Sequence, residues 1–175
     1  NHRPQMGSVR PNVFKKPERI ADSWGRIQLE QFDLKPEDIR TKRLDFIPFS
    51  KTGYNIQEAD IIVAGGRGMG SKENFDKLYE LADAIGGVVG ATRPLVEKGW
   101  IELPYQVGQT GKTVSPKLYL AFGISGAIQH VSGISGADTI VAINNDPKAE
   151  IFQHANYGIV GDCMEVLNDM LAHLK

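Results

Sequence analysis

Residues 118–130, Leu-Tyr-Leu-Ala-Phe-Gly-Ile-Ser-Gly-Ala-Ile-Gln-His, indicate the fold of this chain. The first five residues form a short apolar run, which is typical of a strand covered on both faces in a parallel sheet. Gly123, Ser125 and Gly126 follow as a turn, and we predict a helix from about Gly126 to Val131. A strand, a glycine-containing turn and a helix in this order form the repeating unit of α/β proteins.

The same alternation extends in both directions along the chain. A helix is predicted from Glu73, with Ser71 as its N-cap and Gly86 at its end, because apolar residues recur there at helical spacing. Short helices are predicted after Pro94 and over 149–155, and a longer one over 164–174. The apolar runs predict strands over 61–64, 88–91, 118–122, 139–143 and 157–160. We therefore predict a doubly wound parallel α/β sheet, a Rossmann-like domain, over residues 59–175.

Residues 1–58 have a different character. Five prolines, at positions 4, 11, 17, 36 and 48, break any long helix, and the alternating stretches Ile27–Glu30 and Leu44–Pro48 predict strands. Two or three strands with charged faces cannot bury enough surface alone, so we expect them to pair with another domain or chain. The chain starts without methionine and without a signal-peptide pattern, so we expect a fragment or a processed product.

The composition narrows the function classes. The net charge of −1 argues against a nucleic-acid-binding surface and gives no reason to expect attraction to anionic membranes. No apolar run approaches the ~18 residues of a membrane span. The single cysteine, Cys163, excludes an internal disulfide, is expected to be a half-buried helix residue, and belongs to no Cys/His cluster that would suggest zinc or iron–sulfur binding.

Polar and glycine residues follow nearly every predicted strand. Ligands of open α/β sheets bind at the carboxyl ends of the strands, so these loops are the expected site. Together they favour a large polar ligand across the sheet edge, and a dinucleotide has that shape. The loops are Gly65–Gly68, Ala91–Arg93, Gly123–Gly126, Asn144–Asp146 and Gly161–Asp162.

Individual loops leave alternatives open. Gly65–Gly70 is not a clean G-x-G-x-x-G motif and is equally consistent with an ordinary strand-to-helix turn. Arg93 can lie over an electron-rich ring or form a surface ion pair. The loop Gln106–Lys112 carries more hydrogen-bonding groups than a structural loop needs, and Ser125 with the amides after it can hold a diphosphate.

These segments resemble the carboxy-terminal, FAD-binding domain of the electron transfer flavoprotein alpha subunit. The resemblance spans essentially the whole chain, which makes it far more specific than any single glycine motif. It rests on residues 118–130, Gly133, Ile140, Ala142, Ile143, Asn144, Gln106–Lys112, Gly90–Arg93, Arg3–Met6 and Val9–Pro11.

The resemblance implies FAD as the cofactor and assigns roles by position. Arg93 would lie beside the flavin ring, Thr110 would bond its N5, and His130 would approach the O2 edge as a positive or hydrogen-bonding group. Gln109, Ser125 and Gln129 would hold the ribityl–phosphate region and Thr92 the diphosphate, while Arg67, Asn144 and Asp162 would face the adenosine. The loops complete the predicted set with Gln106, Val107, Gly108, Gly123 and Gly126.

Two positions depart from the family pattern. Thr92 stands where some relatives have serine, which retains the hydroxyl group. Asn145 stands where some relatives carry lysine, so a charged contact to the adenosine half is not expected. The family's amino-terminal domain is also missing, and residues 1–58 look like the linker and strands that would complete its sheet.

The implied function is electron transfer. The family carries electrons from flavin dehydrogenases, such as acyl-CoA dehydrogenases of fatty acid oxidation, to a quinone oxidoreductase or other acceptor. It works as a heterodimer with a beta subunit, in the cytoplasm of prokaryotes or the mitochondrial matrix. Some members bifurcate electrons, and the residues that decide this lie largely outside the chain. The alternatives are an NAD-dependent dehydrogenase, for which a clean fingerprint and acidic partner are lacking, and a nucleotide-binding regulatory module.

Overall fold

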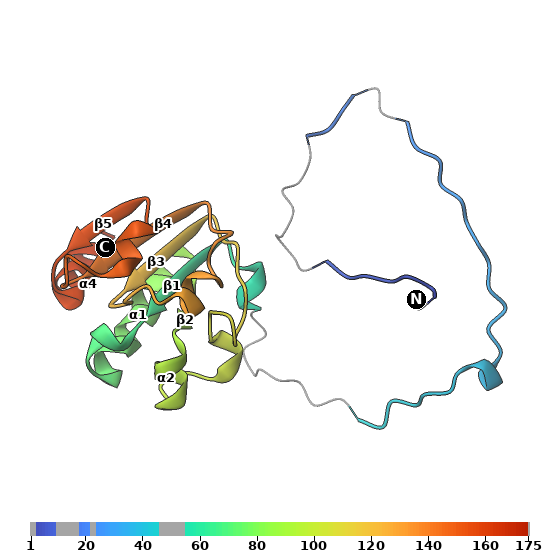
Figure 1. Ribbon diagram of the computed structural model, residues 1–175, viewed down its shortest axis with the longest axis horizontal. Helices are drawn as coiled ribbons and strands as arrows, with labels where there is room; N and C mark the ends of the chain where they lie inside the picture. Colours follow the sequence, from blue (N-terminus) through green and yellow to red (C-terminus); the bar gives the residue numbers. More distant parts are fainter. Residues whose placement is uncertain (1–2, 10–17, 22–23, 46–54, 175) are drawn as a thin grey trace.

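The computed structural model describes residues 3–9, 18–21, 24–45 and 55–174 (Figure 1). Residues 61–160 supply five parallel strands in the order β2-β1-β3-β4-β5. Their bounds are β1 Ile61–Gly65, β2 Val88–Ala91, β3 Leu118–Phe122, β4 Thr139–Asn144 and β5 Tyr157–Val160. The predicted α/β class and all five strands are confirmed. The order reverses between β1 and β3, so the chain leaves these two neighbouring strands toward opposite faces of the sheet.

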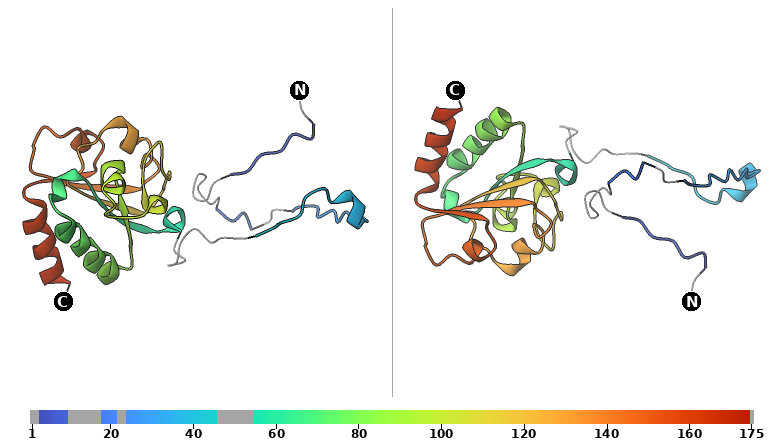
Figure 2. Two further views of the ribbon diagram at one scale, coloured as in Figure 1. Left: turned by 90° about the horizontal axis from the view of Figure 1, so that it is seen from below. Right: turned by 90° about the horizontal axis from the view of Figure 1, so that it is seen from above.

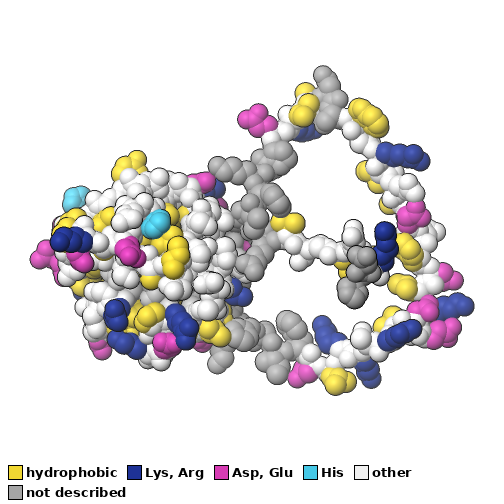
Figure 3. Space-filling view, viewed as in Figure 1, with side chains coloured by type: hydrophobic (Ala, Val, Ile, Leu, Met, Phe, Trp, Pro, Cys, Tyr) yellow, Lys and Arg dark blue, Asp and Glu magenta, His cyan; other side chains and the backbone are white. Residues whose placement is uncertain are grey.

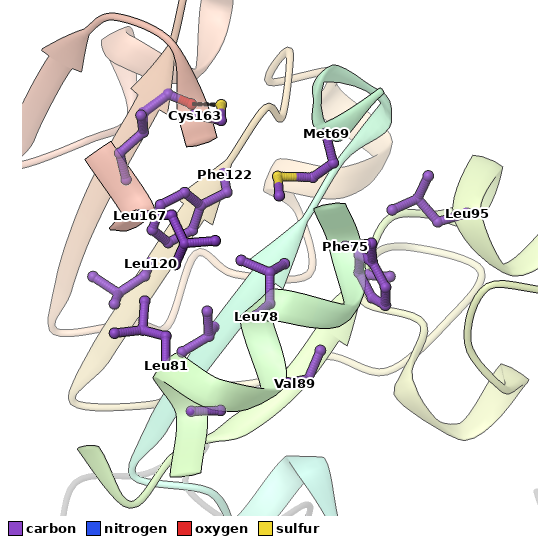
Figure 4. Packing of buried hydrophobic residues seen from close by; sticks show 14 of the residues in the cluster. Met69, Phe75, Leu78, Leu81, Val89, Leu95, Leu120, Phe122, Cys163 and Leu167 are labelled. Atoms are coloured by element: carbon purple, nitrogen blue, oxygen red, sulfur yellow. Dashed lines mark hydrogen bonds between the residues drawn. The ribbon is translucent and has the colours of Figure 1, made fainter. Parts of the chain in front are cut away.

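One face of the sheet is covered by two helices that lie side by side, α1 (Lys72–Ile85) and α4 (Cys163–His173) (Figure 2). The Ser71 hydroxyl accepts a hydrogen bond from the Asn74 amide at 3.2 Å, and Gly86 ends α1 with a left-handed φ of 68°. Both predicted caps are therefore confirmed. Phe75 and Leu78 of α1 pack with Phe122 of β3 and other apolar side chains in a fully buried cluster (Figure 4).

The opposite face is covered by short segments. Ile62, Tyr119 and Ala142 of the sheet pack there against Ile124 and Ile151 from the loops. The helix predicted from Gly126 is confirmed only as α3 (Ile128–Val131), because Gly126 has a φ of 95° that no helix contains. Prediction of a helix over 149–155 was wrong. This segment is a 3-10 turn, Glu150–Gln153, and the Ile151 amide donates to the Ser125 carbonyl at 3.0 Å, tying it to the loop after β3.

The strand β5 also differs from expectation. Its apolar sequence predicted a strand covered on both faces, yet all four residues are exposed, including Tyr157 at 66%. The cause is its place in the sheet, because β5 lies at the edge and pairs with β4 alone. Apolar sequence therefore identified the strand but not its burial.

The strand predicted over Ile27–Glu30 is absent. These residues are extended without strand pairing, and Ile27 and Leu29 are 88% and 89% exposed. A strand exists only with a partner that completes its hydrogen bonds, and the described part of the chain offers none to this segment. The second predicted strand, Leu44–Pro48, lies partly outside the described residues, because that described range ends at Asp45.

The surface of the folded part carries both signs of charge. On the face shown in Figure 3, Lys and Arg side chains alternate with Asp and Glu instead of gathering into one patch. This agrees with the net charge of −1. Among the described residues, no helix combines the length and the apolar character needed to cross a membrane.

Two glycines with a positive φ, Gly123 and Gly99, allow a test of the close backbone approach in the loop after β3. Gly123 has a φ of 62°, and a Cβ there would lie 2.7 Å from the Gly68 Cα, whereas Gly99 has a φ of 69° and open space around it. We expect Gly99→Ala to lower the free energy of unfolding by about 1–2 kcal/mol through backbone strain alone. Gly123→Ala should cost a further ~1–3 kcal/mol through the clash. Urea unfolding of both variants measures the difference, and equal losses would contradict the close approach.

Candidate functional site

A cavity of about 750 Å³ lies at the carboxyl ends of β1, β2 and β3. The loops after β1 and β3 line it, so it occupies the point where the strand order reverses, which is the usual ligand position in this architecture. Its volume is within the ~300–1,000 Å³ typical of small-molecule sites. A larger hollow of about 1260 Å³ lies between α1, β2 and residues 99–105, away from these loops.

Most of the residues predicted for the site meet in this cavity. They come from five segments that are separate in sequence, and the sheet brings them to one edge. The predicted residues that line it are Arg67, Thr92, Arg93, Gln106, Val107, Gly108, Thr110, Gly123, Ser125, Gln129, His130 and Asn144.

The loop from Gln106 to Lys112 is closed by its own backbone. The Lys112 amide donates to the Gln106 carbonyl at 2.7 Å, and the Val107 amide donates to the Ala91 carbonyl of β2 at 2.9 Å. Inside this loop the buried Gln106 donates from Nε2 to Oγ1 of Thr110 at 3.0 Å. The exposed Thr110 hydroxyl accepts this bond, so its own hydrogen remains available to donate to a ligand.

Two helices begin at the cavity without a side-chain cap. Thr92 precedes α2 (Arg93–Glu97) and Ala127 precedes α3, and neither N-cap side chain bonds the first turn. The helices α1 and α4 differ, because Ser71 and Asp162 cap them. In α2 only the Arg93 amide is left for a ligand, because Pro94 has no N–H and the Leu95 amide donates to the Thr92 carbonyl at 3.0 Å, whereas the first amides of α3 have no side-chain cap.

His130 is buried at the inner wall of the cavity, with 6% of its surface exposed. Its Nδ1 lies 3.0 Å from the Val107 carbonyl oxygen, and its Nε2 lies 2.9 Å from the Tyr119 hydroxyl. Burial lowers the pKa of His130 to about 4, and the bond to Val107 only partly opposes this. The ring is therefore neutral near pH 7, so of the two states expected from the resemblance, positive or hydrogen-bonding, the structure favours the hydrogen-bonding one.

Arg93 combines the two alternatives left open by the sequence. It lines the cavity and also forms an ion pair with Glu97, one helical turn along α2, at 2.7 Å. Both side chains are more than half exposed, and such a surface pair contributes little to stability. The guanidinium can therefore leave Glu97 for an anionic or aromatic ligand at small cost.

Residues 55–135 match the family described as "Electron transfer flavoprotein FAD-binding domain". The chain carries an electron transfer flavoprotein FAD-binding domain. The resemblance inferred from the sequence is thereby confirmed, and so is FAD as the cofactor of this domain.

Curated relatives agree with this flavoprotein assignment. A "Protein FixB" of Clostridium saccharobutylicum is 53% identical over 176 residues, which cover 99% of this chain and 52% of the relative. An "Electron transfer flavoprotein subunit alpha" of Thermoanaerobacterium thermosaccharolyticum is 52% identical over 173 residues, with 99% and 52% covered. Another of that name, from Megasphaera elsdenii, is 52% identical over 169 residues, with 95% and 50% covered. The chain thus spans about half the length of these relatives.

The site of the flavoprotein domain fits a dinucleotide in its donor chemistry. FAD carries a diphosphate, which the uncapped start of α3 and the Ser125 turn suit. It also carries a ring system with acceptor atoms, which the Thr110 hydroxyl suits. Asn144 and Arg67 supply further polar groups at the same edge of the sheet.

Three predicted residues do not line the cavity. Asp162 caps α4, where its Oδ1 accepts from the Met164 and Glu165 amides at 2.8 and 3.1 Å. Gly126 packs its backbone against Ile151, which explains a glycine there without a ligand. Gln109 belongs to the same closed loop as Thr110, and its amide donates to the Gln129 carbonyl at 2.6 Å.

The structure adds residues that the sequence did not single out. The segment after β4 turns back toward the cavity because the Asp146 amide donates to Asn144 Oδ1, and the Lys148 amide to Asp146 Oδ1, both at 2.9 Å. The Asn-x-Asp-x-Lys spacing of these turns was the available signal. The lining residues outside the loops expected from the sequence are Pro94, Ala127, Lys148, Ala149 and Glu150, whereas Gly66, Gly68, Ile124 and Asp146 belong to those loops.

The neutral His130 makes stability depend on pH in a defined window. The unfolded chain protonates this histidine near its ordinary pKa of 6.5, whereas the folded domain does so only near 4. Stability is therefore fully retained above pH 6.5 and falls as the pH drops toward 4. A difference of about 2.5 pKa units, at ~1.4 kcal/mol per unit, corresponds to about 3–4 kcal/mol.

Urea unfolding between pH 7 and 4 tests this prediction. His130→Gln should flatten the decline, whatever its own stability at pH 7. His154→Gln, which changes an exposed histidine, should keep the wild-type decline. A His130→Gln protein with the wild-type pH slope would show that another group causes the acid sensitivity.

Proposed function

We propose that this chain holds FAD in the cavity at the β1/β3 switch point and serves as the flavin-carrying half of an electron transfer flavoprotein. The observation that supports this most is the meeting of the Ser125 turn, Arg93 and the Thr110 loop in one cavity. The bound flavin would supply the electron chemistry, while the protein binds and orients it. The electrons would pass from flavin dehydrogenases, such as acyl-CoA dehydrogenases, to a quinone oxidoreductase or other acceptor.

Different residues of the cavity would bind different parts of the cofactor. The Ser125 turn, the start of α3 and Gln129 would hold the ribityl–phosphate region, and Thr92 would contribute to the diphosphate. Arg67 and Asn144 would face the adenosine. Arg93 and Thr110 would face the flavin ring, where reduction adds negative charge that a guanidinium stabilises.

The proposed assembly is a heterodimer with an electron transfer flavoprotein beta subunit, since two of the relatives are named alpha subunits. Residues 1–58 would belong to the sheet of an amino-terminal domain, and residues 59–175 would form the FAD-binding domain. The exposure of Trp24, Ile27 and Leu29, at 88–91%, supports this because such side chains are normally covered. The bacterial sources of the relatives support a cytoplasmic location.

An absorbance spectrum of the purified protein, with and without added FAD, tests the proposal directly. The expected result is a yellow protein with flavin bands, from which heat releases a nucleotide with the mass of FAD. A colourless protein that does not take up FAD, and binds NAD or another nucleotide instead, would overturn the flavin function.

Arg93→Ala should make the one-electron midpoint potential of the bound flavin more negative. Loss of one charge contact worth ~1–2 kcal/mol corresponds to a shift on the order of 50–100 mV for one electron. Spectroelectrochemical titration measures the potential, and Arg93→Lys serves as the control that keeps the charge. Unchanged potentials in Arg93→Ala would remove this residue from the ring.

Thr110→Ala should alter the visible flavin spectrum and change the difference between the two one-electron midpoint potentials. The reason is that it removes the hydroxyl that Gln106 orients. Thr110→Ser keeps a hydroxyl at the same place and should retain the wild-type spectrum. If the alanine and serine variants have identical spectra and midpoints, Thr110 does not bond the ring.

A further inference from the structure

Tyr119 lies on β3 with its side chain fully buried, although it carries a hydroxyl group. A buried hydroxyl requires a hydrogen-bond partner, and here Nε2 of His130 is 2.9 Å away. Burial raises the pKa of Tyr119 well above its ordinary value of 10, so the hydroxyl keeps its proton. Tyr119 can therefore act as a permanent donor.

The positions of the protons follow from the partners. The Val107 carbonyl oxygen can only accept, so the nitrogen facing it at 3.0 Å, Nδ1 of His130, carries a proton. In the neutral ring the other nitrogen, Nε2, then has a lone pair, and the Tyr119 hydroxyl must donate to it. The chain of bonds runs from the Tyr119 O–H to Nε2, and from Nδ1–H to Val107.

These three residues connect different parts of the domain. Tyr119 belongs to β3, His130 to α3, and Val107 to the loop that carries Thr110. His130 and Val107 line the cavity, whereas Tyr119 belongs to the core cluster behind it. The Tyr119 and His130 rings are tilted by 52° with centroids 6.0 Å apart, so their contact rests on the hydrogen bond and not on stacking.

We propose that Tyr119 is a positioning residue of the flavin pocket that keeps both ring nitrogens of His130 occupied. His130 is then held in one orientation at the inner wall of the cavity, by Tyr119 at Nε2 and by the Val107 carbonyl at Nδ1. The bonds themselves stand without a ligand, while their effect on a flavin rests on the function proposed above.

The first test is the protonation of His130 in the wild-type, flavin-loaded protein. With ¹⁵N-labelled histidine, NMR distinguishes protonated from unprotonated ring nitrogens, and the signal is assigned by its loss in His130→Asn. At pH 7 the expected state has a proton on Nδ1 and none on Nε2. A proton on Nε2, or on both nitrogens, would overturn the proposal.

The second test is Tyr119→Phe, which removes the hydroxyl and keeps the ring. The Nε2 resonance should move to that of an acceptor without a donor. The dissociation constant of FAD should rise about 2–10-fold, as expected for one lost hydrogen bond, with a changed flavin spectrum. Tyr157→Phe, on the exposed strand β5, is the matched control and should change none of these.

The outcomes separate this proposal from the function on which it rests. A Tyr119→Phe protein with the wild-type Nε2 resonance and FAD affinity would overturn the positioning role. If that variant does not fold, the wild-type resonances decide alone. If the wild-type protein holds no FAD, the proposed function fails, whereas the flavin-free resonances still show whether Tyr119 donates to His130.

Discussion

The contact between the loop after β1 and the loop after β3 determines the shape of the site. The Gly66 amide donates to the Phe122 carbonyl at 2.8 Å, and the Gly68 amide donates to the Gly123 carbonyl at 2.9 Å. Only glycines allow the two backbones to approach so closely, because a Cβ at Gly68 or Gly123 would lie within 3 Å of the opposite backbone. This pairing holds the two loops together at the floor of the cavity, and the other loops are arranged around it.

The resulting site combines charged side chains (Arg67, Arg93, Asp146, Lys148 and Glu150) with many directed hydrogen-bonding groups. Gln106, which itself lines the cavity, and Tyr119 behind it each fix the orientation of a neighbour that lines the cavity. Such supporting bonds reduce the freedom of the lining side chains before a cofactor arrives, which lowers the entropic cost of binding it. The fixed groups are of the kind that tune a bound flavin through dipoles more than through net charge.

The sequence predicted the sheet well because parallel strands covered by helices leave a clear apolar pattern, as in residues 118–122. It also predicted most of the site, since the glycine and polar residues after each strand must meet at one edge. It failed where a tertiary contact overrides a local pattern. Gly126 marked a helix start by sequence but adopts a positive φ against Ile151. The state of His130 was not predictable, because it depends on Tyr119 and Val107, which lie 11 and 23 positions away.

The exposed strand β5 affects how this polypeptide can be handled. One side of its backbone pairs with β4, and the other side presents amides and carbonyls to any extended segment that comes near. The sequence Tyr-Gly-Ile-Val contains none of the lysines or prolines by which proteins protect such borders. Intermolecular strand addition is the physical hazard, and it grows with protein concentration. Solubility during purification therefore depends on whether another segment or chain covers the free edge of β5, and not on how tightly the cofactor is bound.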